Sequence, residues 1–313
     1  MEQKVVAIRD AYGAALKNLG GQNEKVVVLE ADVGSSSKSI LFGKAYPERY
    51  FNVGIAELNM VAMAAGFAKS GLIPFVNCFA VFMTTRAADP LNSLIAYDNL
   101  NVKVAATYCG LSPAYDGASH HANSDLAFIR SVPNFTVISV CDAVETEKAV
   151  QAAAKLNGPV YLRLSRAGAP VIFDESYDFQ VGKGVLLKEG KDVTLIATGA
   201  LVQQSLAAAE LLAAEGISAE VLDIHTIKPI DQELILASAQ KTGAVVTAEE
   251  HSIYGGLGSA VAEVLVEHAP LPLERIGMSG YAESGPYEAL LHKYELDAPA
   301  IAAKAKKVLT RKK

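Results

Sequence analysis

The sequence has no tryptophan and few cysteines, and the shortage of cysteine excludes several classes of protein. Its three cysteines, Cys78, Cys109 and Cys141, are widely spaced and form no Cys-x-x-Cys pair. An odd number of isolated cysteines argues against a disulfide framework and against a cysteine-bound zinc site. We therefore expect a protein of a reducing compartment, the cytoplasm.

The sequence also lacks a basic excess and a long hydrophobic run. Lysine and arginine number 28 against 34 aspartates and glutamates, which gives a net charge of −6. Proteins that bind nucleic acid or anionic membranes usually carry a basic patch. The longest apolar stretch, residues 60–68, falls far short of the ~20 residues that span a bilayer. We therefore expect no nucleic-acid partner and no membrane association.

What the sequence does contain is an alternation of short β-type runs with longer alanine-rich helical runs. This order predicts an α/β fold with mostly parallel sheets, and the uniformly apolar strands are typical of sheets covered on both faces. A stretch without helical period, punctuated by Pro170, Gly182, Gly184 and Gly190, divides the chain. We predict two three-layer domains, residues 1–168 and 191–313, joined by a linker at 169–190.

Individual elements follow from the same pattern. The predicted strands are residues 25–29, 74–77, 102–107, 136–140, 160–164, 193–197, 219–222, 244–247 and 273–276. The predicted helices are residues 5–19, 56–69, 84–97, 125–131, 143–156, 202–214, 231–238 and 257–268.

Residues 52–60 (NVGIAELNM) place Glu57 at the start of a very apolar helix. The helix dipole favours a glutamate in the first turn, which is a purely structural reason for its presence. An acid beside so apolar a helix can also be partly desolvated, which raises its pKa and lets it share a proton with a ligand nitrogen. The periodicity alone leaves both interpretations of Glu57 open.

Two further segments hold side chains that suit a ligand. Phe79 and Phe82 lie three residues apart at a strand-to-helix junction, where they form either a flat wall for a ring or ordinary core packing. Residues 115–121 (YDGASHH) follow a strand and precede a helix. Open α/β sheets place ligands at such junctions, so this dense group of Asp, Ser and two His is a candidate site.

In order and spacing, these segments resemble the transketolase family. Residues 54–60 (GIAELNM) are similar to the family signature around the glutamate that activates thiamine diphosphate, and residues 116–120 (DGASH) to its Asp-Gly-Pro-Thr-His loop. Residues 130–134, 164–166 and 227–231 are also family-like. The resemblance implies a pyrimidine-binding domain followed by a transketolase C-terminal-like domain.

The resemblance also implies roles for individual residues. Glu57 would bond the aminopyrimidine ring of thiamine diphosphate, a cofactor that acts as an electron sink. Phe79 and Phe82 would pack against that ring, with Asp32 near the cofactor. The family has another aromatic residue where this chain has Thr85, so the aromatic wall is expected to be incomplete.

On the substrate side, the resemblance assigns Asp116 to a hydroxyl near the ketose carbonyl. His120 would bond substrate oxygens and help proton movement. The positions that bind the sugar phosphate at its far end are occupied by Arg9, Ser36, Arg166 and Tyr108. Arginine suits this task because its fork forms paired bonds to phosphate. Tyr108 departs from the histidine usual in transketolases, which leaves the exact substrate open.

The sequence lacks the Gly-Asp-Gly motif that, in the family's N-terminal domain, helps bind Mg²⁺ and the diphosphate. We therefore expect no metal site in this chain. The expectation is a large partner subunit that holds Mg²⁺ and the diphosphate of thiamine diphosphate, in an α2β2 assembly with active sites at the interface. The chain would then be the small subunit of a transketolase, which moves a two-carbon ketol unit from a ketose phosphate to an aldose phosphate.

Two main alternatives remain open, and a deoxyxylulose-phosphate-synthase-like fragment is a further relative. The β subunit of a 2-oxoacid dehydrogenase E1 component fits the length and domain order, but such chains usually carry a His-Ser-Gln-type loop where this one has residues 116–121. A regulatory subunit without catalysis is the second alternative. The joint presence of Glu57, Asp116 and His120 argues against it, because a degenerate copy has little reason to keep all three.

Overall fold

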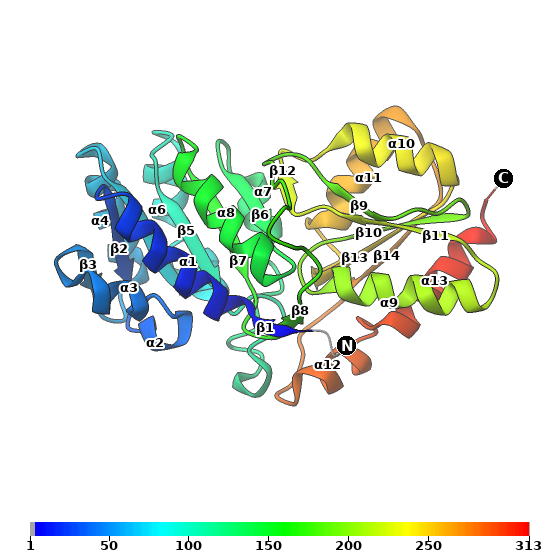
Figure 1. Ribbon diagram of the computed structural model, residues 1–313, viewed down its shortest axis with the longest axis horizontal. Coiled ribbons are helices and arrows are strands. Elements are labelled where there is room, and N and C mark those ends of the chain that lie inside the picture. The colour runs from blue at the N-terminus through cyan, green and yellow to red at the C-terminus, as the bar shows by residue number, and fades with distance from the viewer. Residues whose placement is uncertain (1–3, 313) are drawn as a thin grey trace.

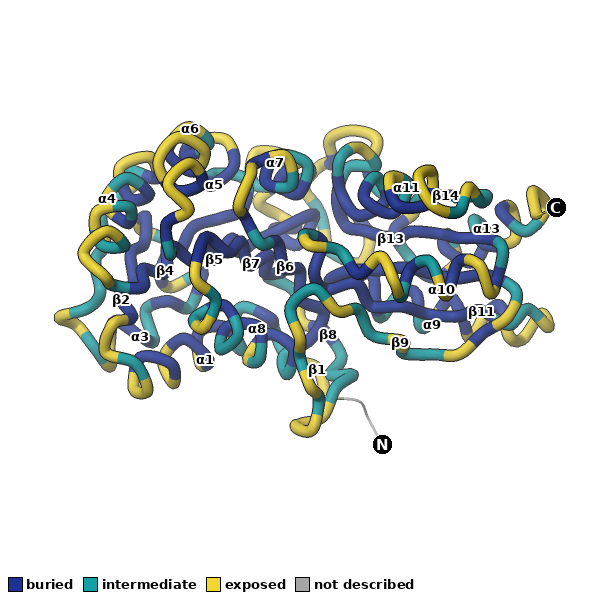
Figure 2. Tube along the Cα trace, turned by 90° about the horizontal axis from the view of Figure 1, so that it is seen from above, coloured by how far each residue is buried: buried dark blue, intermediate teal, exposed yellow. Residues whose placement is uncertain are grey.

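The computed structural model describes residues 4–312, so residues 1–3 and 313 of the predicted domains lie outside the described part. Two sheets lie side by side along the long axis of the molecule, each with helices on both faces (Figure 1). The predicted α/β fold of two three-layer domains with mostly parallel sheets is confirmed. Figure 2 shows the strands buried between helices whose outer surfaces are exposed.

The first sheet has seven strands in the order β12-β6-β7-β5-β4-β2-β3, all parallel except for the β12–β6 pair. One face packs against α1 (Ile8–Gln22) and α8 (Ala143–Lys155), and the other against α4 (Glu57–Lys69), α5 (Ala80–Arg86) and α7 (Asp125–Ser131). The strands are β2 (Val26–Glu30), β3 (Tyr50–Asn52), β4 (Ile73–Phe79), β5 (Lys103–Thr107), β6 (Thr136–Ser139), β7 (Val160–Leu164) and β12 (Thr226–Lys228).

The second sheet has five strands in the order β14-β13-β10-β11-β9, parallel except for the β11–β9 pair. Helices α9 (Leu201–Ala214) and α13 (Ala298–Leu309) cover one face, and α10 (Gln232–Thr242) and α11 (Leu257–His268) cover the other. The strands are β9 (Val185–Lys188), β10 (Val193–Ala197), β11 (Ala219–Asp223), β13 (Val245–Ser252) and β14 (Leu273–Met278).

Several short strands were not predicted from the sequence pattern, and one of them, β12, joins the second half of the sequence to the first sheet. β1 (Val5–Ala7) pairs antiparallel with β8 (Gly168–Pro170), so the predicted helix at 5–19 begins only at Ile8. The expected linker also contains β9, which extends the second sheet. β12 comes from the second half of the sequence but joins the first sheet beside β6.

The predicted continuous helix at 84–97 is wrong. α5 begins earlier, at Ala80, and ends at Arg86; the short α6 (Ala88–Pro90) and a π-helical turn (Leu91–Ala96) follow it. Pro90 has no backbone N–H and its ring crowds the preceding turn, which explains a break at this point. The remaining elements are α2 (Gly34–Ser37), α3 (Ile40–Ala45), α12 (Tyr287–Lys293) and 3-10 turns at Pro47–Arg49 and Ala114–Asp116.

No helix in the described part of the chain is both long and apolar enough to cross a membrane.

Candidate active site

The candidate residues gather at one edge of the first sheet. β2, β4, β5 and β7 run parallel, so their carboxyl ends meet at the same edge, which is where open α/β sheets bind ligands. Each of these strands ends at or just before a predicted site residue: Asp32, Phe79, Tyr108 and Arg166. The sheet topology therefore collects residues that are far apart in the sequence.

Glu57 is the first residue of α4 and lies on the buried face of that helix. The buried positions of α4 are Glu57, Met60, Val61 and Ala64, a spacing of three and four residues that defines one helical face. The carboxylate is therefore drawn into the core side of the helix, and only 5% of it is exposed. Its place in the first turn also lets the helix dipole stabilise its negative charge.

Arg86 pairs with Glu57, a partner that sequence analysis did not identify. Arg86 Nη1 lies 2.7 Å from Glu57 Oε1, and the guanidinium carbon lies 3.8 Å from the centre of the Phe82 ring. Arg86 is four residues after Phe82 on α5, so one helical turn places the cation over the ring. The ion pair therefore joins the buried acid to the predicted aromatic wall.

The aromatic wall forms, with partly different members from those expected. Phe79 and Phe82 stack with ring centres 5.8 Å apart, and Tyr108 stacks on Phe79 at 4.1 Å. The His120 ring meets the edge of Phe82 at 5.3 Å. Thr85 is exposed and donates its hydroxyl to Val81 O, so it adds nothing to the wall. Tyr108 and His120 extend the wall instead.

Two arginines converge on Tyr108 at the predicted anion-binding end. Arg9 Nη1 donates to the Tyr108 hydroxyl at 2.6 Å and to Ser36 O at 3.3 Å. The Arg166 guanidinium lies 5.3 Å from the centre of the Tyr108 ring. Arg9, Ser36, Tyr108 and Arg166 are thus brought together, with Ser36 contributing its backbone carbonyl. Two guanidiniums and a phenol form a donor set that suits a tetrahedral anion.

The predicted loop residues Asp116 and His120 lie beside these groups. Asp116 Oδ2 is 3.7 Å from Arg166 Nη1, and His120 Nδ1 is 3.0 Å from the Ser119 hydroxyl. The neighbouring His121 is buried, and neither of its ring nitrogens has a hydrogen-bond partner. Burial also lowers the pKa of His121. The loop therefore offers a carboxylate and an imidazole between the aromatic wall and the arginines.

Asp32 contacts the turn that precedes α4. Its Oδ1 accepts a hydrogen bond from Asn52 Nδ2 at 3.1 Å, and Asn52 Oδ1 accepts one from Gly54 N at 2.9 Å. Gly54 has a φ of +74°, a backbone conformation that would be strained in a residue with a side chain. The exposed Asp32 thereby supports the turn that leads into Glu57.

These residues fit the ring of a thiamine-type cofactor. Glu57 Oε2 accepts no hydrogen bond from any described residue, whereas Oε1 is held by Arg86. The carboxylate is nearly buried and has one oxygen available, and Arg86 joins it to the aromatic wall. Such a carboxylate can accept a hydrogen bond from a flat, nitrogen-containing ring that packs on the wall. The fit concerns the ring only.

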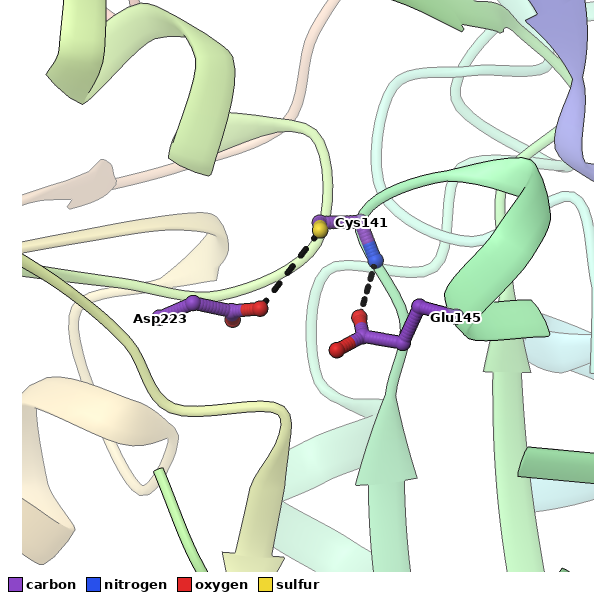
Figure 3. Close-up of side chains that lie close together, drawn as sticks. All are labelled: Cys141, Glu145 and Asp223. Atoms are coloured by element: carbon purple, nitrogen blue, oxygen red, sulfur yellow. Dashed lines mark hydrogen bonds between the residues drawn. The ribbon is translucent and has the colours of Figure 1, made fainter. Parts of the chain in front are cut away.

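One group of three possible metal-ligating side chains lies elsewhere in the described part of the chain, where the two domains meet. It comprises Cys141, Glu145 and Asp223, all buried (Figure 3). Their atoms already have protein partners: Cys141 Sγ donates to Asp223 Oδ2 at 3.5 Å, and Cys141 N donates to Glu145 Oε2 at 2.8 Å. Burial raises the pKa of both carboxyl groups.

Fold and site together define an α/β protein whose first domain presents a buried carboxylate, an aromatic wall and two arginines that converge on Tyr108. Comparison with known families agrees with this two-domain fold. Residues 4–170 match the transketolase pyrimidine binding domain, and residues 182–301 match the transketolase C-terminal domain. The chain belongs to the transketolase family.

Individual relatives match nearly the whole chain. A putative transketolase C-terminal section from Methanocaldococcus jannaschii is 44% identical and covers 94% of both chains. A 6-deoxy-6-sulfo-D-fructose transketolase subunit from a Clostridium species is 42% identical over 97% of this chain and 95% of its own. A solved structure described as a split gene transketolase, inactive beta4 tetramer, is 49% identical, with a TM-score of 0.93 over 98% of this chain and 100% of its own.

Proposed function

We propose that this chain is the small subunit of a thiamine-diphosphate-dependent transketolase. It moves a two-carbon ketol unit from a ketose phosphate to an aldose phosphate, and it is active only with a large subunit that carries the diphosphate and Mg²⁺ site. The observation that carries the proposal is the available oxygen of Glu57, which lies beside a helix start and is connected through Arg86 to the aromatic wall.

The residues of this chain perform three tasks in the proposed reaction. Glu57 holds a proton between its available oxygen and a ring nitrogen of the cofactor, while Phe79 and Phe82 exclude water from one side of that ring. Thiamine diphosphate, when bound, supplies the carbon nucleophile and the electron sink. His120 and Asp116 bond the hydroxyl groups of the sugar next to the reacting carbon.

The far end of the substrate is proposed to bind at Arg9 and Arg166. Both guanidiniums flank the Tyr108 ring, and the Tyr108 hydroxyl accepts a hydrogen bond from Arg9. A neutral phenol can donate its proton to an anionic oxygen once a substrate arrives. One relative is described as acting on a 6-deoxy-6-sulfo sugar, so the substrate screen should include a sulfonate beside the phosphates.

The proposed partner is a transketolase large subunit in an α2β2 assembly. Ile55 and Leu58, which flank Glu57, are 75% and 53% exposed. Exposed apolar side chains beside a site are typical of an interface. The solved relative described as an inactive beta4 tetramer is consistent with a small subunit that needs a second kind of chain. Metal and diphosphate would therefore meet the ring-binding residues across the interface.

The test is turnover by the reconstituted complex of this chain with its large subunit. Glu57→Gln keeps the size of the side chain but removes its capacity to hold the proton, and we expect kcat to fall by about 10²–10⁴-fold. Assembly, measured by size-exclusion chromatography with light scattering, should not change. Unchanged turnover in this variant would remove Glu57 from catalysis and favour a non-catalytic subunit.

A screen of donor substrates separates the proposed transketolase reaction from the 2-oxoacid dehydrogenase alternative. Ketose phosphates should act as donors, whereas pyruvate and branched 2-oxo acids should not. The extended similarity to transketolase chains disfavours the 2-oxoacid dehydrogenase activity. Turnover of a 2-oxo acid at a rate above that of any ketose phosphate would overturn the transketolase assignment.

A further inference from the structure

The loop that carries Asp116 and His120 is closed at its base. Gly110 and Ala122 face each other in an isolated β-bridge, with N–H···O distances of 3.2 and 3.0 Å. We call residues 109–122 the substrate loop. The β-bridge fixes the two ends of the loop. The conformation of the residues between them therefore depends on the contacts that those residues make.

The C-terminal domain holds this loop at two points and contacts the chain just beyond it at a third. Leu111 N donates to the carboxylate of Glu250, a residue of β13 that lies 139 positions away. The Ser284 hydroxyl donates to Tyr115 O at 2.6 Å, and Ser252 N donates to Asn123 O, just beyond the loop, at 2.8 Å. All three contacts cross between the domains.

Glu250 is the central contact. Its side chain is 2% exposed and both oxygens are used: Oε1 by Leu111 N and Oε2 by the Tyr287 hydroxyl at 2.9 Å. Gly110 has a φ of +58°, and a Cβ there would lie 2.5 Å from the carboxyl carbon of Glu250. The glycine therefore permits both the backbone turn and the close approach of the carboxylate.

The consequences of this contact reach the anion-binding end of the site. The Ser112 hydroxyl accepts a hydrogen bond from Arg166 N at 3.1 Å, and Pro113 O accepts one from Arg166 Nη1 at 2.8 Å. Both groups directly follow Leu111 in the substrate loop. Movement of Leu111 away from Glu250 would therefore move the backbone that orients the Arg166 guanidinium.

We propose that Glu250 is a positioning residue through which the C-terminal domain fixes the substrate loop, and with it Asp116, His120 and Arg166, in the geometry that binds substrate. This gives the C-terminal domain a role in substrate affinity. The link to substrate rests on the proposed function above, whereas the hold on the loop does not.

The chain contains a matched control next to Glu250. Glu249 is also buried, with 1% exposure, and also accepts hydrogen bonds from two groups, Leu257 N at 2.7 Å and Gly258 N at 2.8 Å. These partners belong to α11 of the C-terminal domain, not to the substrate loop. Glu249→Met therefore removes a comparable buried acceptor without touching the loop.

The first measurement is hydrogen–deuterium exchange of the substrate loop in this chain. Glu250→Met keeps a side chain of similar size but removes both acceptors, and exchange in residues 109–122 should rise about tenfold or more. Glu250→Gln keeps one oxygen for Leu111 N and should restore most of the protection. If the Met variant does not fold, Gly110→Ala, whose Cβ would lie 2.5 Å from the Glu250 carboxyl carbon, disrupts the same contact from the loop side and should also speed loop exchange. Loop exchange no faster in Glu250→Met, or in Gly110→Ala where the Met variant does not fold, than in Glu249→Met would overturn the proposal.

The second measurement is the kinetics of the reconstituted complex. We expect Glu250→Met to raise the KM for the ketose phosphate about tenfold, with kcat and the Kd for thiamine diphosphate within about twofold of wild type, and Glu249→Met to leave KM unchanged. A faster-exchanging loop with the KM of the control would refute the link to substrate. A wild-type complex without ketol transfer would refute the proposed function instead, and the exchange comparison would still decide whether Glu250 holds the loop.

Discussion

Replacing Asp223 by asparagine should change how the stability of the protein depends on pH. Asp223 and Glu145 are both fully buried at the junction of the domains. The described groups that bond them are the thiol and backbone N–H of Cys141 and the hydroxyl of Tyr177, and none of these is a cation. Asp223 Oδ1 has no hydrogen-bond partner. Two uncompensated carboxylates cannot both be charged there, so we expect the pair to share a proton.

The sign and size of the effect follow from the raised pKa. Burial raises the pKa of Glu145 from 4.5 to about 7. The unfolded chain releases this proton as the pH passes about 4.5, while the folded chain keeps it until about pH 7. The stability that the proton provides is therefore complete below pH 4.5 and is lost as the pH rises to 7. At about 1.4 kcal/mol for each pH unit, the loss is about 3 kcal/mol.

In Asp223→Asn, the amide can donate to Glu145 without a shared proton. Burial still raises the pKa of Glu145 in this variant, but the Asp223 carboxyl, whose pKa is also raised by burial, no longer titrates. The loss of stability between pH 5 and pH 8 should therefore be smaller in the variant than in wild type. The assay is urea unfolding followed by circular dichroism between pH 5 and 8, with the difference between wild type and variant taken at each pH. Parallel runs with a chelator separate a bound proton from a bound metal ion.

Asp142→Asn is the control for this experiment. The Asp142 carboxylate is buried near the pair but accepts hydrogen bonds from the backbone N–H groups of Glu145, Ile172 and Phe173. Its replacement should lower the free energy of unfolding by a similar amount at pH 5 and pH 8. Equal pH dependence in wild type and Asp223→Asn would refute the shared proton.

Two further predictions concern the candidate site. Arg86→Leu removes the cation that bonds the buried Glu57. Because Arg86 is half exposed, we expect the free energy of unfolding at pH 7 to fall by only about 1 kcal/mol. A variant that is more stable than wild type in urea unfolding would contradict this expectation. Tyr108→Phe removes the 2.6 Å bond from Arg9 and should raise the KM for the anionic donor about threefold to tenfold at nearly constant kcat. A fall in kcat without a change in KM would place Tyr108 at the reacting carbon instead.

Much of the fold could be predicted because buried parallel strands leave a strong local signal. The apolar runs at 160–164 and 193–197 coincide with β7 and β10, since strands covered on both faces have few polar residues. β12 and β9 gave no such signal. They are short edge strands whose conformation depends on a neighbouring strand, β6 or β11, and sequence periodicity does not report such pairing.

The residues of the candidate site also fall into two groups, those that could be predicted from the sequence and those that could not. Several site residues could be singled out because they lie at a strand end, in a family-like motif or at a position that the family uses to bind phosphate. The structure brings these residues together: Phe79, Phe82, Tyr108, His120, Arg9 and Arg166. Arg86 and Glu250 could not be singled out, because their importance depends on partners 29 and 139 positions away. A lone arginine or glutamate in a sequence does not reveal which distant group it will meet.

Calorimetry of thiamine diphosphate binding in the presence of Mg²⁺ shows whether the ring-binding half of a divided cofactor site lies in this chain. The titration is performed on this chain alone, on the large subunit alone and on the two together. We expect negligible binding to this chain alone and tight binding to the mixture, and we expect the affinity of the mixture to fall when Phe82 is replaced by alanine. Tight binding to this chain alone, or no binding to a complex whose assembly is confirmed, would contradict a divided cofactor site.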